Sequence, residues 1–181
     1  MIVRDAASAD ADSLSAIYGD AVLHGFGTFE EDPPSAAEMD TRRCAIQDQG
    51  LPYLVAEMDG RILGFAYAGP FRPRAAYRYT LEDSVYVSPQ AKGKGVGRAV
   101  LSAVISACEA LGVRQLMAVI GDKENAGSIG LHSALGFEQT GTSRSVGFKH
   151  GRWVDVVYMQ KALNGGDTLV PSGPGVSLKG H

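Results

Sequence analysis

The composition of this chain excludes several classes of protein. With 181 residues, 45% of them hydrophobic and 20% charged, it is long enough for one domain with a sizeable core. The net charge of −3 argues against a nucleic-acid partner. We find neither a long apolar run nor an N-terminal signal pattern, so we expect no membrane partner and a cytoplasmic location.

The N-terminal part is predicted to hold a short strand and two helices. The strand covers residues 1–4. Apolar residues at helical spacing follow Asp10 and indicate a helix that ends near Gly25. The segment from Ser35 to Glu38 has the form of a capping box, so a second helix should start there and stop at Gly50.

Strands are predicted in the middle of the chain. Residues 53–58 and 61–68 alternate in polarity and flank an Asp-Gly dipeptide, which is typical of a tight hairpin. Residues 69–78 form a loop that is rich in proline and arginine. A further strand is predicted at residues 80–88, where β-branched residues accumulate before a proline.

The remaining elements complete the predicted order β-α-α-β-β-β-α-β-α-β-β, an α/β (α+β) fold with a mixed sheet. They are a helix at 96–111, a strand at 114–120, a short helix opened by Asn125 or Ser128, and strands at 138–148 and 152–160. We interpret Cys44 and Cys108, both in predicted helices, as buried apolar residues. Residues 164–181 are rich in glycine and poor in apolar groups, so we expect a disordered tail after one domain at 1–163.

Residues 82–98 say most about function, because they read as a strand, a basic glycine-rich turn and the start of a helix. The turn holds Lys92, Gly93, Lys94, Gly95, Val96, Gly97 and Arg98. Glycines let backbone N–H groups approach an anion closely, and a helix N-terminus adds unpaired donors and its dipole. We therefore interpret the turn as a diphosphate-binding loop; the alternative is a surface turn that is merely rich in Gly and Lys.

The spacing within this turn excludes two common nucleotide loops. A Walker loop requires Ser or Thr directly after its lysine, and none follows Lys94. A dinucleotide fingerprint requires G-x-G-x-x-G, whereas this turn reads G-x-G-x-G. The pattern Q-x-x-G-x-G that begins at Gln90 instead resembles the coenzyme A pyrophosphate loop of the GNAT N-acetyltransferases.

Further segments extend this resemblance over residues 1–163. The pattern from Asn125 to Phe137 is similar to the family helix that lies along the pantetheine. The segment G-F-K-H-G-x-W-x-D at residues 147–155 resembles the phosphinothricin and methionine sulfoximine N-acetyltransferases. The resemblance implies the GNAT acyl-CoA N-acyltransferase fold, in which the sheet splays after its fourth strand and acetyl-CoA enters the gap as co-substrate. It also implies a homodimer.

The reaction implied by the resemblance is direct acetyl transfer, in a ternary complex, to the α-amino group of a small amino-acid analogue. Such an enzyme would acetylate phosphinothricin, methionine sulfoximine or methionine sulfone, in a detoxification role. The amine must lose a proton before it attacks, since a free α-amino group is largely protonated near neutrality. The oxyanion needs a fixed N–H donor. No cluster of His, Cys or Asp has metal-ligand spacing in the sequence, so we expect no metal.

Two residues are candidates for the catalytic roles. Glu82 lies at the start of the strand before the glycine turn and is our candidate general base; the alternative is a solvated acid that pairs with Arg78. Asp83 is the neighbouring alternative, but strand alternation should turn it to the other face. His132 is the second candidate, as base, proton relay or substrate contact. From the residues alone, a histidine on an apolar helix face is more often part of the core.

The remaining candidates fall into two groups. For acetyl-CoA we expect contacts from the glycine turn and from Val85, Tyr86, Val87, Asn125 and Ser128. For the acceptor we expect contacts from Phe29, Arg72, Arg74, Ala75, Ala76 and Tyr77. Guanidinium groups suit carboxylate or phosphinate binding, although a solvated basic loop, or one that steers phosphate, is an open alternative. Phe29 could instead belong to the core.

Other functions remain open at this point. The acceptor could be a protein N-terminus, a polyamine or an aminoglycoside, although a polyamine or aminoglycoside pocket should be lined with acids. The chain could also be a non-catalytic acyl-CoA-binding module, which the presence of Glu82 and His132 disfavours. The residues do not indicate the physiological acceptor or the group that protonates the departing thiolate.

Overall fold

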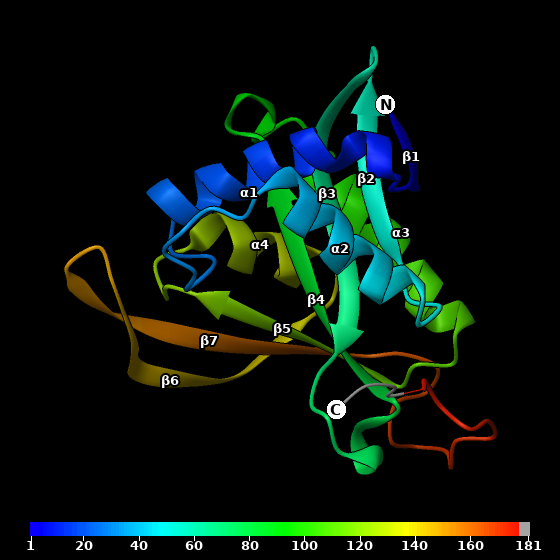
Figure 1. The fold of residues 1–181 in the computed structure, drawn as a ribbon. Helices are drawn as coiled ribbons and strands as arrows, with labels where there is room; N and C mark the ends of the chain where they lie inside the picture. The colour runs from blue at the N-terminus through cyan, green and yellow to red at the C-terminus, as the bar shows by residue number, and fades with distance from the viewer. Residues whose placement is uncertain (178–181) are drawn as a thin grey trace.

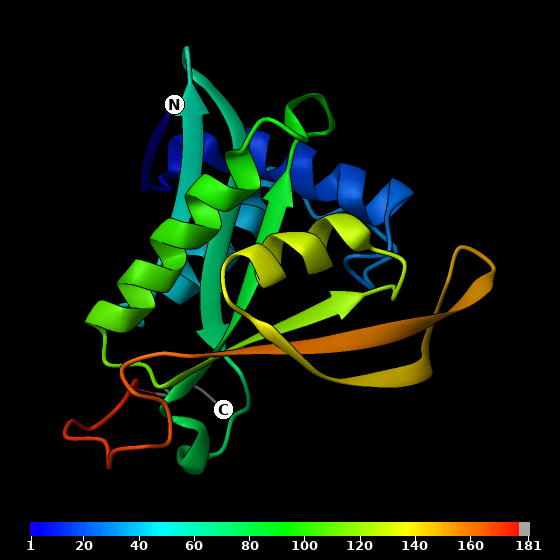
Figure 2. The same cartoon turned by 180° about the vertical axis from the view of Figure 1, so that it is seen from behind.

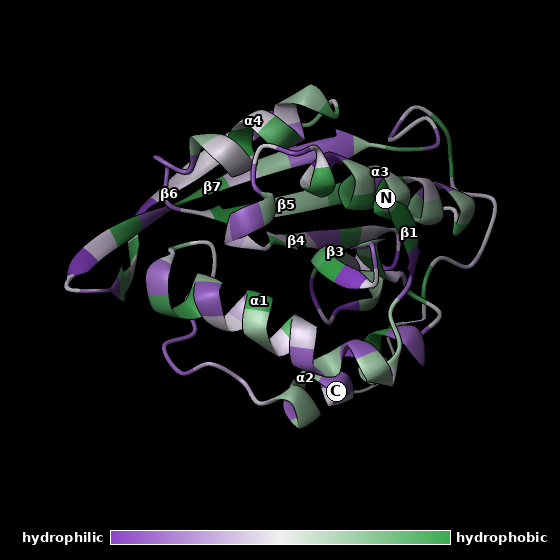
Figure 3. Cartoon of the chain, turned by 90° about the horizontal axis from the view of Figure 1, so that it is seen from above, coloured by the Kyte–Doolittle hydropathy of each residue, from purple (hydrophilic) through white to green (hydrophobic). Residues whose placement is uncertain are grey.

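The computed structural model describes residues 1–177, which form three layers (Figure 1). A seven-stranded sheet with the order β1-β2-β3-β4-β5-β7-β6 carries α1 and α2 on one face and α3 and α4 on the other (Figures 2 and 3). The strands are β1 (Ile2–Asp5), β2 (Tyr53–Met58), β3 (Arg61–Pro70), β4 (Thr80–Val87), β5 (Gln115–Gly121), β6 (Glu138–Lys149) and β7 (Arg152–Ala162). The helices are α1 (Ala11–His24), α2 (Ala36–Gln47), α3 (Val96–Ala110) and α4 (Ala126–Ala134). The predicted order of elements is confirmed.

Local sequence signals explain several of these boundaries. The Ser35 hydroxyl accepts a hydrogen bond from the Glu38 amide at 3.2 Å, as expected of the cap that starts α2. Asp59 and Gly60, with φ of 52° and 72°, form the tight turn between β2 and β3. Gly112, with φ of 75°, follows the end of α3 in the left-handed conformation that glycine adopts readily.

Two apolar clusters hold the layers together. On one face of the sheet, Val100 and Val104 of α3 are fully buried with Leu81 and Leu116. On the other face, Leu14 and Val22 of α1 pack in the cluster that contains Tyr53, Val55 and Phe65. Each fully buried side chain of this size contributes about 1.5–3 kcal/mol. Cys108 is buried as expected, but Cys44 is partly exposed, because it lies away from the buried face of α2.

The sheet opens between β4 and β5, and this opening positions the functional site. The two strands are parallel and pair from Thr80↔Gln115 to Asp83↔Ala118. Beyond that pair β4 continues to Val87 and β5 to Gly121 without further pairing between them, so the two strands separate (Figure 1). The splay expected from the resemblance is therefore present. It leaves the β5-facing edge of β4 open from Ser84 onward.

The C-terminal segment follows β7 without a further helix or strand among its described residues. The Arg114 guanidinium donates hydrogen bonds to the carbonyl oxygens of Gly166 and Leu169, at 2.8 and 2.7 Å. The Tyr79 hydroxyl donates to the Gly173 carbonyl at 2.6 Å. The division into a domain at 1–163 and a disordered tail at 164–181 stays a prediction, and residues 178–181 lie outside the described part. Within residues 1–177, no helix is both long and apolar enough to cross a bilayer.

Candidate active site

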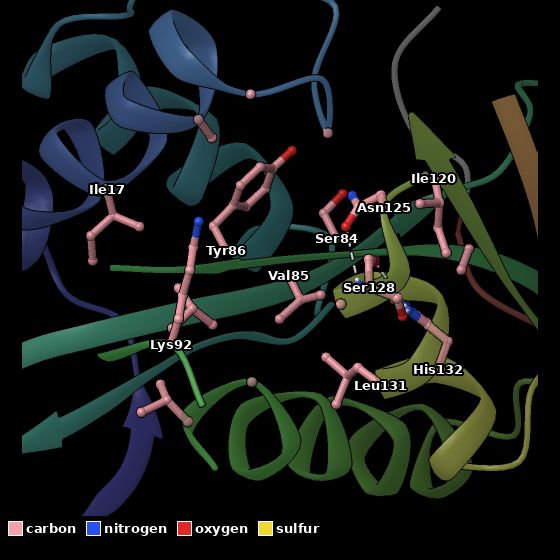
Figure 4. Close-up of a pocket in the computed structure, with 18 of the residues that line it drawn as sticks. Ile17, Ser84, Val85, Tyr86, Lys92, Ile120, Asn125, Ser128, Leu131 and His132 are labelled. Atoms are coloured by element: carbon pink, nitrogen blue, oxygen red, sulfur yellow. Dashed lines mark hydrogen bonds between the residues drawn. The ribbon is translucent and has the colours of Figure 1, made fainter. Parts of the chain in front are cut away.

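A cavity of about 670 Å³ occupies the opening between β4 and β5. Its walls come from the second half of β4, the glycine turn, the start of α3, one side of α1 and the first turns of α4 (Figure 4). Lys92 lies on the left of that view and His132 on the right. The cavity thus has the basic glycine turn on one side and the buried imidazole of His132 on another.

The glycine turn has the geometry of an anion-binding loop. Gly93 and Gly95 have φ of 76° and 80°, and a Cβ added to either would have open space around it within the described structure. Gly95 is the N-cap of α3 and has no side chain with which to cap the first turn, so the amides there are available to a ligand. Lys92 and Arg98 also line the cavity. These features fit a diphosphate.

The other residues of the turn have different surroundings. Lys94 is exposed and lies outside the cavity lining, so it faces solvent rather than the cavity wall. Val96 lines the cavity but is only 1% exposed and belongs to the core. A Cβ on Gly97 would approach Leu131 Cδ2 at 3.1 Å. Gly97 thus permits close packing between α3 and α4, which is a role distinct from that of the two left-handed glycines.

Strand β4 presents its open edge to the cavity through Val85, Tyr86 and Val87. On its opposite edge β4 pairs with β3, where Ala66 lies opposite Val85. The Tyr86 ring packs edge-on against the Tyr18 ring, at 4.8 Å between centroids. The ring is therefore a packing element, and the backbone of this edge is what β4 can offer to an elongated ligand with amide groups.

Helix α4 covers the opposite wall. The Asn125 side chain caps it by accepting a hydrogen bond from the Ser128 amide at 3.2 Å, and both residues line the cavity (Figure 4). One turn later His132 is 2% exposed, and its Nε2 lies 2.9 Å from Oδ2 of Asp83. Its Nδ1 lies 2.8 Å from the Ser128 carbonyl oxygen. Both ring nitrogens of His132 are therefore engaged within the protein.

The Asp83–His132 pair has unusual protonation equilibria. Burial raises the pKa of the Asp83 carboxyl, and the hydrogen bond from His132 opposes this only in part. Burial alone would lower the pKa of His132, but the Asp83 carboxylate outweighs it and the pKa of the imidazole is raised. The two shifts agree on one point: the pair binds a proton more tightly than an isolated histidine does.

Glu82 lies on the opposite face of β4 from Asp83, outside the cavity lining. Burial raises the pKa of its carboxyl to about 7, with a smaller upward contribution from Asp83 and an opposing one from Arg72. Gly69 of β3 lies directly opposite Glu82, and a Cβ built there would meet open space among residues 1–177. A partly buried carboxyl of this pKa, with room beside it, can accept a proton near neutral pH.

The expected acceptor residues are not brought together in one pocket within a single chain. Arg72 is exposed, lies over the Phe71 ring at 4.5 Å, and is near enough to Glu82 to influence its pKa. Arg74, Ala75, Ala76 and Tyr77 are exposed on the same loop. Phe29 is 41% exposed and fills the space above Gly147, where a Cβ would come within 2.3 Å of its ring.

Sequence reasoning missed a polar network beside Phe29. The Tyr18 hydroxyl lies 2.9 Å from the Thr28 hydroxyl and donates to Glu30 at 2.8 Å, while Arg42 holds the same carboxylate at 2.7 Å. Lys149 is 1% exposed and donates from Nζ to the Thr28 carbonyl at 2.8 Å. A lysine within the strand pattern of β6 was the signal that could have indicated this buried network. These hydrogen bonds hold the loop between α1 and α2 in place.

Comparison with known proteins identifies the family. A family model described as an acetyltransferase (GNAT) domain matches residues 3–158. The chain belongs to the GNAT acetyltransferases. The fold and the enzyme class expected from the resemblance are thereby confirmed.

Individual members of this family are similar over most of the chain. A phosphinothricin N-acetyltransferase of Alcaligenes faecalis is 54% identical, over 94% of this chain and 85% of that protein. An L-methionine sulfoximine/L-methionine sulfone acetyltransferase of Pseudomonas paraeruginosa (strain DSM 24068 / PA7) is 42% identical, over 90% of this chain and 94% of its own length. The crystal structure of a GNAT superfamily phosphinothricin acetyltransferase from Sinorhizobium meliloti, in complex with acetyl-CoA, has 49% identity and a TM-score of 0.91, over 94% of this chain and 92% of that one.

These findings establish that the protein is an acetyl-CoA-dependent N-acetyltransferase. The cavity in the splayed sheet fits this co-substrate, because the open glycine turn suits a diphosphate and the β4 edge suits an amide-bearing chain. The described residues contain no group of three or more His, Cys, Asp or Glu side chains that could hold a metal ion.

Proposed function

We propose that this acetyltransferase transfers the acetyl group of acetyl-CoA to the α-amino group of a small amino-acid analogue of the phosphinothricin, methionine sulfoximine or methionine sulfone type. The names of its relatives support this substrate class. The observation that carries the proposal is the position of Glu82, whose carboxyl has a pKa of about 7 and lies in β4 beside Asp83, a wall residue of the acetyl-CoA cavity.

Glu82 is the general base in this proposal. Near neutral pH Glu82 is ionised in a substantial share of the protein molecules. In that form it can take a proton from the ammonium form of the acceptor. His132 is the weaker candidate for a base because the Asp83–His132 pair already holds a tightly bound proton and so does not readily accept another. Acetyl-CoA supplies the activated acyl group. The backbone N–H groups of Val85 to Val87 supply fixed donors where negative charge develops on the acyl oxygen.

Arg72 recognises the acidic part of the acceptor. Its guanidinium is exposed and lies on the Glu82 side of β4, so it can bind a carboxylate or a phosphinate while the amine approaches Glu82. Arg74, Ala75, Ala76 and Tyr77 line the same loop and would contact the rest of the acceptor. A polyamine or aminoglycoside is disfavoured, because this loop presents positive charge to a positively charged ligand.

A homodimer would complete the acceptor pocket. The β6–β7 hairpin extends away from the body of the sheet, and Val146, Phe148 and Trp153 on it are 57%, 59% and 62% exposed (Figure 1). Phe148 and Trp153 lie opposite each other in the hairpin, with ring centroids 5.3 Å apart. Apolar side chains grouped in this way are typical of an interface.

We place the enzyme in the cytoplasm, with a role in detoxification.

A thiol-release assay on the purified protein tests the proposal. L-phosphinothricin, L-methionine sulfoximine and L-methionine sulfone are offered with acetyl-CoA, beside an alanine-terminated peptide, spermidine and an aminoglycoside as alternative acceptors. We expect turnover on at least one of the first three, with higher kcat/KM than on any alternative. Turnover confined to an alternative acceptor would contradict the substrate class. Calorimetric binding of acetyl-CoA without turnover on any compound would favour a non-catalytic binding module.

A further inference from the structure

The contact between Asp83 and His132 joins two elements that are far apart in sequence, at a point where the sheet opens. Asp83 forms the last pair between β4 and β5, and His132 lies on α4, which covers the opening. The two side chains are 1% and 2% exposed and meet at 2.9 Å. Both residues line the acetyl-CoA cavity. The contact therefore lies at the buried end of the co-substrate site, on the face opposite Glu82.

The hydrogen-bond partners define how many protons the pair holds. The Ser128 carbonyl can only accept, so the hydrogen on the His132 ring that faces it belongs to Nδ1. Between Nε2 and the carboxylate oxygen, one further proton is needed for a hydrogen bond to exist at all. Whether that proton is on nitrogen or on oxygen, the pair carries no net charge with it and one negative charge without it.

The surroundings favour retention of this proton. Oδ1 of Asp83 is buried and lacks a hydrogen-bond partner within residues 1–177, so a negative charge on this carboxylate is stabilised at Oδ2 alone. Burial raises the pKa of the Cys108 thiol of α3 to about 12, and the Asp83 carboxyl is near enough to add to this rise. The Phe137 ring packs edge-on against the imidazole at 5.0 Å. Loss of the proton would thus leave an anion among apolar groups and a neutral thiol.

We propose that Asp83 is a positioning residue for His132: the two side chains share one proton between Oδ2 and Nε2, and the pair serves as the buried proton donor on the acetyl-CoA side of β4. This inference rests on the proposed function, because it assigns a proton that acetyl transfer requires. As the N–C bond forms and the C–S bond breaks, its electron pair leaves on sulfur. An ammonium acceptor loses two protons as it becomes an amide: Glu82 takes the first and passes it to solvent, and takes the second as the N–C bond forms. The pair delivers one proton to the sulfur.

This arrangement places the two proton transfers on opposite faces of one strand. Glu82 gains a proton on the acceptor face, and the Asp83–His132 pair loses one on the acetyl-CoA face, so the net charge of the two adjacent positions does not change. Afterwards Glu82 releases its proton to solvent and the pair takes one up. One negative charge therefore moves from the Glu82 face to the Asp83–His132 face during the transfer, while the total charge of these two substantially buried positions stays constant.

Nitrogen-15 NMR of the imidazoles tests the shared proton without any substrate. In the wild-type protein we expect the His132 nitrogen signals to show no loss of the shared proton until well above the pH at which free imidazole titrates, about 6.5. Exposed His24 provides the internal reference spectrum. A His132 ring that becomes neutral with one bare nitrogen near that pH would overturn the proposal, whatever the outcome of the acceptor assays.

Asp83→Asn is the matching variant, since it keeps the side-chain size but cannot hold the acidic proton. We expect His132 to become a neutral ring with hydrogen on Nδ1, and the high-pH limb of kcat to move to lower pH. At neutral pH we expect kcat to fall roughly 10-fold or more with little change in the Kd of acetyl-CoA. Asp122→Asn, a second acid of the cavity wall, is the control and should leave the His132 spectrum unchanged.

A purely structural role for Asp83 predicts a different result. In that case Asp83→Asn would lower the melting temperature and leave both the protonation of His132 and the pH profile of kcat as in the wild type. That combination would overturn the proposal. If the variant does not fold, the wild-type NMR titration still decides it, because it measures the shared proton directly.

Discussion

Glu82 and Asp83 are consecutive residues of β4, yet their carboxyl groups lie on opposite faces of the sheet and in different chemical environments. Asp83 is hydrogen-bonded to His132 at 2.9 Å within the co-substrate cavity. Glu82 lies on the other face, where Arg72 is the cation that influences it. Strand alternation alone separates the two groups. A single strand thus contributes to both the acceptor side and the acetyl-CoA side of the site.

The raised pKa of Glu82 couples stability to pH. Its ordinary value is 4.5 and its value in the folded protein is about 7, so the folded state binds the proton more tightly. The contribution of Glu82 to the free energy of unfolding is therefore largest below about pH 4.5. It falls by about 3 kcal/mol as the pH rises to 7. Glu82→Gln should remove this loss and melt at higher temperature than the wild type at about pH 8. Thermal melts at a series of pH values measure the difference. An equal pH dependence in both proteins would contradict the buried environment assigned to Glu82.

The glycine turn offers a matched pair of substitutions. Gly95 and Gly112 have φ of 80° and 75° and open space where a Cβ would lie within the described structure, but only Gly95 lines the cavity. Alanine at either position should cost about 1–2 kcal/mol of unfolding free energy through backbone strain. Gly95→Ala should in addition weaken acetyl-CoA binding about tenfold, as measured by calorimetry. Equal acetyl-CoA affinities in the two variants would argue against phosphate binding at this turn.

Arg72→Ala separates acceptor binding from co-substrate binding. We expect the KM of the acceptor to rise about 10- to 100-fold, because a charge-assisted hydrogen bond is lost, while the KM of acetyl-CoA stays the same. Arg72 also lowers the pKa of Glu82, so its removal should move the rise of kcat/KM to higher pH. Arg61→Ala, an exposed arginine at the start of β3, is the control. A parallel rise in both KM values would point to a general loss of structure instead.

The β6–β7 hairpin predicts the oligomeric state. Trp153→Asp introduces a charge beside Phe148, in the apolar group proposed as the dimer contact. Light scattering should show a dimer for the wild type and a monomer for the variant, with lower acceptor turnover in the monomer. Val170→Asp is the control, because Val170 is 91% exposed at a distance from the hairpin in sequence. A monomeric wild type would contradict the homodimer.

Much of the fold could be predicted because its signals are local. The Asp-Gly dipeptide indicated the β2–β3 turn, the segment from Ser35 indicated the start of α2, and Gly112 indicated the end of α3. Element ends differ from the predicted ones by a residue or two, since frayed turns depend on tertiary contacts. The glycine turn was predictable for the same reason as the fold. Its residues are consecutive, so the whole ligand-binding loop forms one local sequence motif.

The parts that escaped prediction depend on contacts between distant residues. The sequence did not indicate that α4 brings His132 onto Asp83, because the two are 49 residues apart and either could have been solvated. Burial of Lys149 depends on the Thr28 carbonyl, 121 residues away. The predicted acceptor residues from Arg72 to Tyr77 could be assigned to a loop but not to a pocket, since their positions depend on tertiary and intersubunit surroundings.

The most direct test of the account is the pH dependence of kcat/KM for the acceptor, measured in wild type and Glu82→Gln from about pH 5 to about pH 9. The account predicts that the wild-type rate rises through about pH 7, where Glu82 ionises. It predicts that Glu82→Gln loses about 10²- to 10⁴-fold in rate and loses this rise, while acetyl-CoA still binds. A variant that retains the wild-type rate and pH profile would contradict the assignment of Glu82 as the base.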